Sequence, residues 1–255
     1  MGKLFNLDSP LMVFLSKMAD LMILNVITLL LCIPIITAGD AVTALYYMTI
    51  KMVKGEECYI VKGYFKSFRE NFKQATLIWL IALVVGMILA GDFWILTNME
   101  LSFANVLTVL IMIVAVVYIF TLMYVFPVLS RFVNSTKNTV KNSLLMSIMN
   151  LPKTILIILI NLVPIVLLFL SYQATPVLIM FGLSVPAYVC SMLFVKIFKR
   201  YEPEEEETNP DELETLSFIR EEEEEKRRLM EQEKAEKTGE NAENSALSDT
   251  EQVEE

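Results

Sequence analysis

The side chains that could do chemistry are few in this chain of 255 residues. It contains no histidine, which removes the commonest general base, the commonest metal ligand and every Ser-His-Asp arrangement. Its three cysteines, Cys32, Cys58 and Cys190, are far apart and have neither metal-ligand nor redox spacing. Phosphate-binding glycine loops, zinc-binding helices and nucleophile motifs are also missing from the sequence. We therefore expect neither an enzyme nor a bound cofactor or metal.

Polar side chains within or beside long apolar runs form the first group of candidate residues. Asp20 lies three residues after Lys17, a spacing at which the two charges partly neutralise each other on a helix. Asn25 and Asn161 lie inside apolar runs, where an amide either joins helices by hydrogen bonds or lines a ligand path. We select Asp20, Asn25 and Asn161 as intramembrane polar candidates. Further ionisable residues lie near the ends of the runs: Asp40, Asp92 and Glu100.

Aromatic and basic residues alternate over residues 60–73. At about 100° per residue, four aromatic residues fall on one arc of a helix: Tyr64, Phe65, Phe68 and Phe72. Four basic residues fall on the adjacent arc: Lys62, Lys66, Arg69 and Lys73. This pattern is typical of an amphipathic helix in the headgroup layer. Such a helix either orients the protein or docks a partner, so these eight residues and Arg131 are the candidate partner or membrane-surface residues.

The elements that must position these residues are apolar helices. A bilayer core of about 30 Å needs roughly 20 mostly apolar residues in a helix. Five segments meet this standard, near residues 18–37, 75–96, 106–126, 153–171 and 176–195. None shows the alternation of a barrel strand, so the sequence predicts an all-α, polytopic transmembrane bundle of about five spans. Residues 41–53 are apolar but too short to cross, and they predict a buried or interfacial helix.

Basic residues concentrate in three regions, 51–73, 131–153 and 196–200, whereas the other two loops carry no lysine or arginine. The positive-inside bias assigns these three regions to the cytoplasm. With five spans in the cell membrane, the N-terminus is then outside and the C-terminus is cytoplasmic. The basic charge fits lipid headgroups of the bilayer rather than nucleic acid.

Charge divides the chain into two parts. Residues 1–200 carry 15 Lys and Arg against 8 Asp and Glu, whereas residues 201–255 carry 6 against 22. We therefore predict a transmembrane helical domain over 1–200 and an acidic cytoplasmic tail over 201–255. Charge pairs four residues apart favour a solvated helix over Asp211–Lys237, and the composition after Thr238 is typical of disorder.

Three blocks of sequence occur in order among the predicted spans. They are PIITAG and TALY within residues 34–46, FKSF and NFKQAT within 65–76, and YVFP, Arg131 and TVKNS within 124–143. Together they resemble the motifs of the YesL-like family of bacterial integral membrane proteins, over roughly residues 1–198. The family is a domain of unknown function, frequent in Gram-positive bacteria and often encoded beside genes for carbohydrate utilisation. The resemblance implies no catalytic or binding residues, and the acidic tail goes beyond its pattern.

Two functions from different classes stay open. The first is an accessory or regulatory membrane protein that binds partners, for which the resemblance points to carbohydrate-uptake machinery. The second is a small membrane transporter or channel. The sparse polarity of the predicted spans favours the first, since a path through lipid needs polar groups within it.

Overall fold

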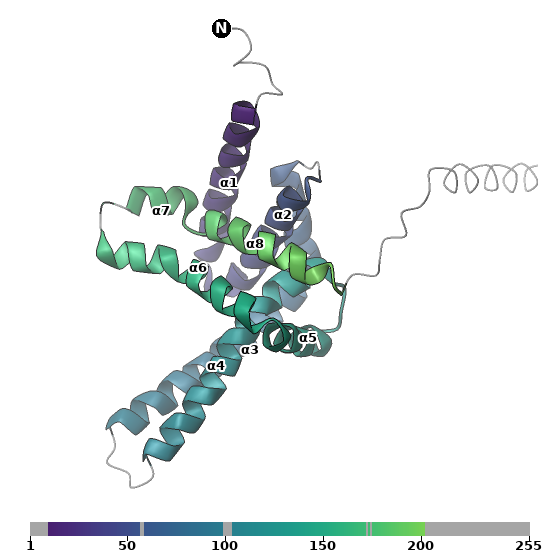
Figure 1. The fold of residues 1–255 in the computed structure, drawn as a ribbon. Helices are drawn as coiled ribbons and strands as arrows, with labels where there is room; N and C mark the ends of the chain where they lie inside the picture. Colours follow the sequence, from purple (N-terminus) through teal and green to yellow (C-terminus); the bar gives the residue numbers. More distant parts are fainter. Residues whose placement is uncertain (1–9, 57–58, 99–103, 172, 174, 202–255) are drawn as a thin grey trace, which may run out of the picture. The chain divides into compact units, whose positions relative to one another are not determined.

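The computed structural model describes residues 10–56, 59–98, 104–171, 173 and 175–201, and every regular element within them is a helix. The predicted all-α class is confirmed (Figure 1). The chain divides into two units, Met1–Tyr201 and Glu202–Glu255. The second unit, on which the predicted acidic tail falls, lies outside the described residues, as do Cys58 and Glu100.

Within the described residues, four helices are long and apolar enough to cross a membrane: α1 (Pro10–Cys32), α3 (Ile60–Asn98), α4 (Ala104–Arg131) and α6 (Leu151–Leu170). Two further helices, α7 (Thr175–Phe181) and α8 (Ser184–Phe198), meet at a break with a bend of 46°. Counted together, they make a fifth span. The remaining elements are the 3-10 helix η1 (Ile35–Thr37), α2 (Ala38–Lys54) and α5 (Thr136–Met149). The count of four or five agrees with the predicted number.

The boundaries differ from the predicted ones for identifiable reasons. α1 ends at Cys32 because Pro34 has no N–H to donate and restricts the residue before it. The amphipathic segment 60–73 is not a separate helix but the first part of α3, which is 39 residues long. No glycine or proline lies between Tyr64 and Val85 to end the helix before the apolar span begins.

α2 is the short apolar helix predicted over residues 41–53, and it lies at the centre of the domain. It contacts α1, α3, α4 and α8, and most of its residues are buried on all sides. Gly39 allows a close approach, because a Cβ on it would lie 2.5 Å from Cβ of Trp79 on α3 and 3.1 Å from Cε1 of Phe126 on α4. Gly55, with a φ of 76°, ends the helix in the left-handed conformation that favours glycine.

α1 and the first half of α3 run in the same direction. The Thr28 Oγ1 atom lies 3.2 Å from the Tyr64 hydroxyl, and further along both segments Trp79 Nε1 donates to the Ile35 carbonyl at 2.6 Å. α2 runs back between them, with Gly39 at the level of Trp79. The predicted orientation assigns opposite crossing directions to α1 and α3, whereas these contacts give the two segments the same direction. The side of the membrane on which the N-terminus lies stays a prediction.

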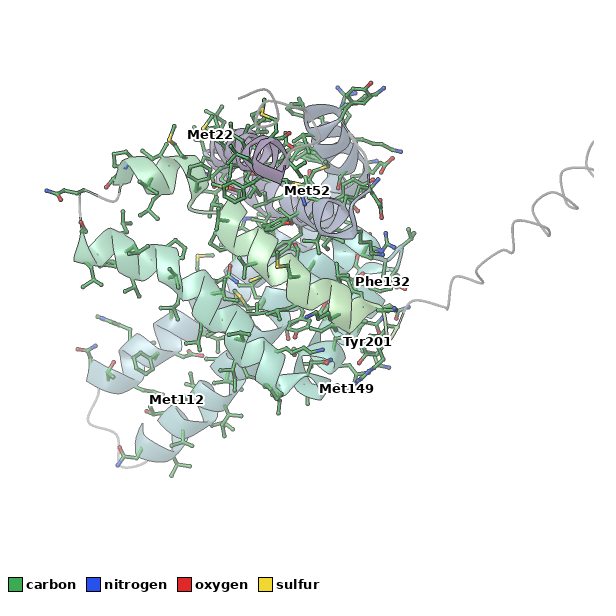
Figure 2. The ribbon with its side chains drawn as sticks, turned by 45° about the horizontal axis from the view of Figure 1, so that its top comes forward. Met22, Met52, Met112, Phe132, Met149 and Tyr201 are labelled. Carbon is green, nitrogen blue, oxygen red and sulfur yellow. The ribbon has the colours of Figure 1, made fainter. Side chains whose placement is uncertain are left out.

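The ends of α4, α5 and α8 meet at another part of the domain (Figure 2). The rings of Phe132 and Phe198 lie 5.2 Å apart and nearly perpendicular. The Tyr201 hydroxyl lies 3.6 Å from the Met149 sulfur at the end of α5. These contacts fasten the last described residues of the chain to α5.

Candidate functional site

Six exposed cations form what we call the basic surface: Lys62, Lys66, Arg69 and Lys73 of α3 with Lys137 and Lys141 of α5. Gln74 joins the two helices, because its Nε2 donates to the Asn134 carbonyl at 2.9 Å and to Thr139 Oγ1 at 3.3 Å. Two basic segments that are distant in the sequence are therefore neighbours. Arg131, also predicted for this surface, is half-buried at the end of α4.

The aromatic residues of the same segment are divided between the surface and the core. Tyr64 is fully buried, and its hydroxyl donates to the Ala41 carbonyl at 3.0 Å. Its prediction as a surface residue is wrong, because α1 and α2 cover this side of α3. Phe68 packs partly against the core, with its ring 5.7 Å from that of Phe72. Phe65 and Phe72 are left as the exposed aromatic side chains of the predicted arc.

A groove of about 880 Å³ lies between α1 and the beginning of α3. It is lined by Asp20, Tyr59, Ile60, Val61, Lys62 and Phe65. The structure therefore brings together Asp20, predicted as an intramembrane residue, and Lys62, predicted as a surface residue. An anionic and a cationic side chain border one groove with apolar side chains between them.

Asn25 joins α1 to the break between α7 and α8. Its Nδ2 donates to the Ile179 carbonyl at 2.7 Å, and its Oδ1 accepts from the N–H groups of Leu183 at 2.7 Å and Ser184 at 2.8 Å. A broken helix in lipid exposes backbone groups that no water can satisfy. The sequence left two roles open for Asn25, joining helices or lining a ligand path, and these hydrogen bonds are those of a residue that joins helices.

Asn161 belongs to a separate polar cluster and does not contact Asn25. Its Nδ2 donates to the Ile157 carbonyl of its own helix at 2.8 Å and lies 3.3 Å from the Cys190 sulfur of α8. The hydroxyl of Tyr46 on α2 interacts with both side chains. The cluster joins α2, α6 and α8, and no described residue places a charge within it.

Asp40 is a further candidate residue, which the sequence indicated only as an ionisable side chain near the end of an apolar run. It is fully buried in the first turn of α2, and neither carboxylate oxygen has a hydrogen-bond partner among the described residues. Because it follows Pro34 and Gly39, the sequence indicates a position just outside the first span. Its small neighbours Gly39 and Ala41 were the available signal, since they allow other helices to approach closely.

Hydroxyl groups supply most of the other polar contacts around α2. Thr49 Oγ1 lies 2.8 Å from Ser191 Oγ of α8, and the Tyr124 hydroxyl of α4 lies 2.9 Å from Thr154 Oγ1 of α6. Thr154 also donates to the Ser147 carbonyl at 2.8 Å. Such bonds between helices stabilise a membrane domain that gains little from the hydrophobic effect.

A model of the family described as "Protein of unknown function, DUF624" matches residues 21–93. The match covers most of α1, all of α2 and most of α3, and so includes Asn25, Asp40 and the α3 part of the basic surface. It supports an uncharacterised domain family over these residues, while the YesL-like name stays a prediction. No curated protein and no solved structure matches the chain.

The matched domain and the apolar helices agree on one conclusion. The chain is a multi-pass integral membrane protein. Its large exposed side chains on α3, α4 and α6, among them Leu77, Met112 and Phe169, are then the surface that lipid covers.

Proposed function

We propose that the protein is an accessory membrane protein that binds an acidic partner through its basic surface and has no catalytic activity. The observation that carries the proposal is the convergence of exposed cations from α3 and α5, fixed by the hydrogen bonds of Gln74. Exposed Phe65 and Phe72 add apolar area beside these charges. Carbohydrate-uptake proteins of the cell membrane are the partner class that the YesL-like resemblance implies.

Removal of charge from the basic surface tests this proposal. We expect the triple variant Lys66→Gln, Arg69→Gln, Lys73→Gln to lose function in a complementation assay while it still inserts. Each cation is worth about 1 kcal/mol of attraction to an anionic surface, so the three together change affinity by roughly 100-fold. Blotting of isolated membranes checks that the variant accumulates.

The matched control removes three exposed cations outside the basic surface, Lys196, Lys199 and Arg200 at the end of α8. This control variant should retain function. A silent α3 triple variant beside an inactive Asn161→Leu variant would contradict docking and favour transport.

A small transporter is the second candidate function, and two observations favour it. The α7–α8 pair is a discontinuous helix, which is the element that forms substrate sites in many transporters. The carboxyl group of Asp40 is buried at the centre of the domain, without a hydrogen-bond partner among the residues that the structure describes. Under this alternative, Asp20→Asn and Asn161→Leu are the damaging changes, because transport depends on polar groups in the interior.

The proposed orientation places the basic surface and the C-terminus in the cytoplasm. We expect Cys58 to escape a membrane-impermeant thiol reagent in intact cells and to react once the cells are opened. Labelling in intact cells would reverse the orientation. A cysteine replacing exposed Ser16, in a chain without Cys32 and Cys58, tests the N-terminus. If the chain crosses five times, the reagent should label that cysteine in intact cells. If α1 and α3 cross in the same direction, as their contacts indicate, the cysteine should be protected from the reagent.

A further inference from the structure

Asp40 lies in a turn of α2 that is closely packed against α3 and α4. Its neighbour Gly39 packs against Trp79 of α3 and Phe126 of α4 at distances that leave no room for a side chain. The Asp40 side chain is wholly buried, and both of its oxygens lack a hydrogen-bond partner in the described part of the chain. A buried polar group without a partner is rare in folded proteins and calls for a physical explanation.

The groups that act on Asp40 do not neutralise a carboxylate. Tyr64 on α3 and Cys32 at the end of α1 are the titratable side chains in electrostatic contact with this region, and both are neutral or negative. On α4, Phe126 lies against the adjacent Gly39, and its side chain does not titrate. The other titratable groups around α2, Tyr46 and Cys190, interact with one another further along the helix.

No described lysine or arginine forms an ion pair with Asp40, and the ion pairs given by the structure involve Glu56 and Glu70. The N-terminal end of α2 attracts a negative charge, but this attraction recovers only a fraction of the cost of burying an unpaired carboxylate. The neutral, protonated carboxyl is therefore the favoured form of the packed state.

A proton fits this position better than a metal ion. Within the described residues, no group of three or more Cys, Asp or Glu side chains is placed to hold a metal. One carboxylate supplies at most two of the six or more oxygen ligands that a hard cation requires. A proton needs only one oxygen.

We propose that Asp40 is a buried proton-binding site that couples the packing of α2 against α3 and α4 to protonation. The carboxyl holds its proton while the three helices are packed. When they separate and admit water, the O–H bond breaks, the proton passes to water and the carboxylate is left hydrated. Burial raises the pKa of Asp40 to about 7, so this exchange falls near neutral pH.

The direction of the pH effect follows from this difference in pKa. The pKa is near 3.8 when Asp40 is hydrated and about 7 when it is buried. Between these values the packed state binds more protons than the unfolded state. The contribution of Asp40 to the free energy of unfolding is therefore fully present below about pH 4. It falls as pH rises and is lowest above pH 7.

Thermal unfolding of the full-length protein in lipid nanodiscs between pH 5 and pH 8.5 tests the site. We expect the midpoint of the wild-type protein to fall by roughly 5–10 °C over this range. Asp40→Asn, which imitates the protonated carboxyl, should abolish most of this fall and exceed the wild type at pH 8.5. The control Asp92→Asn removes a carboxylate near the far end of α3 and should follow the wild type. A pH slope retained in Asp40→Asn would overturn the proposal.

Infrared difference spectroscopy of the wild-type protein supplies a measurement that does not depend on folding of the variant. A band of a protonated carboxyl that disappears with rising pH near neutrality supports the proposal. Its absence at pH 6 would overturn the proposal, because a buried, protonated Asp40 must contribute such a band. The band should persist in Asp20→Asn, which removes the partly buried carboxyl of α1.

Discussion

Replacement of Asn25 by alanine is expected to lower the free energy of unfolding of the membrane domain by about 3 kcal/mol. The variant loses all three hydrogen bonds to the α7–α8 break, and leaves the Ile179 carbonyl and the N–H groups of Leu183 and Ser184 without their side-chain partner. Water cannot replace the amide, since Asn25 is completely buried. Thermal or denaturant unfolding in mild detergent measures the effect.

Asn161→Ala is the matched control, because it makes the same chemical change on another apolar helix. Its amide bonds to a helical carbonyl, that of Ile157, and to the weakly bonding sulfur of Cys190. The Tyr46 hydroxyl, which also interacts with this amide, keeps Cys190 as a partner in the variant. We expect a loss below about 1 kcal/mol. Equal losses in the two variants would show that the α7–α8 break does not depend on Asn25.

Gly39→Ala is expected to destabilise the domain by about 2–3 kcal/mol. The added methyl would lie 2.5 Å from Cβ of Trp79 and 3.0 Å from its Cγ. Cβ of Trp79 is fixed to the backbone of α3, so the clash is relieved only if α2 and α3 move apart. Such a movement would disturb the packing around Asp40 and weaken the contact between α2 and α4.

Gly91→Ala supplies the control, because it adds the same methyl to α3 where no atom lies within 4 Å. Within a helix this change normally stabilises by up to about 1 kcal/mol. The unfolding midpoint of Gly39→Ala should therefore lie below that of the wild type, and the midpoint of Gly91→Ala above it. A neutral Gly39→Ala variant would mean that α2 and α3 are less closely packed than the structure has them.

Much of the fold follows from the sequence because the bilayer restricts the possible structures. Apolar runs near 20 residues must be helices in lipid, and the short run at 41–53 had to be covered by protein or lie in the interface. The break at Gly182 was not predicted, although Gly182 and Pro186 are local signals that end a helix. The partner that satisfies the break, Asn25, is 158 residues away from Leu183 in the sequence.

The candidate residues were predicted less well than the spans. Helical periodicity places Tyr64 and Phe65 on one arc of α3, but it does not tell which part of that arc α1 and α2 will cover. For Asp40, the sequence shows only a charge beyond a proline and a glycine. The neighbouring Gly39 packs against Trp79 and Phe126, which belong to later helices, so the burial of this turn could not be read from the local sequence.

The bonds of Asn25 also set an order of events during synthesis. A ribosome that adds about 5–20 residues per second needs roughly 8–30 s to make the 158 residues that separate Asn25 from Leu183. During this interval the amide of Asn25 is in a completed apolar helix without its final partners. α1 can therefore form these contacts only after α8 has been made, so an early helix of the domain completes its contacts among the last.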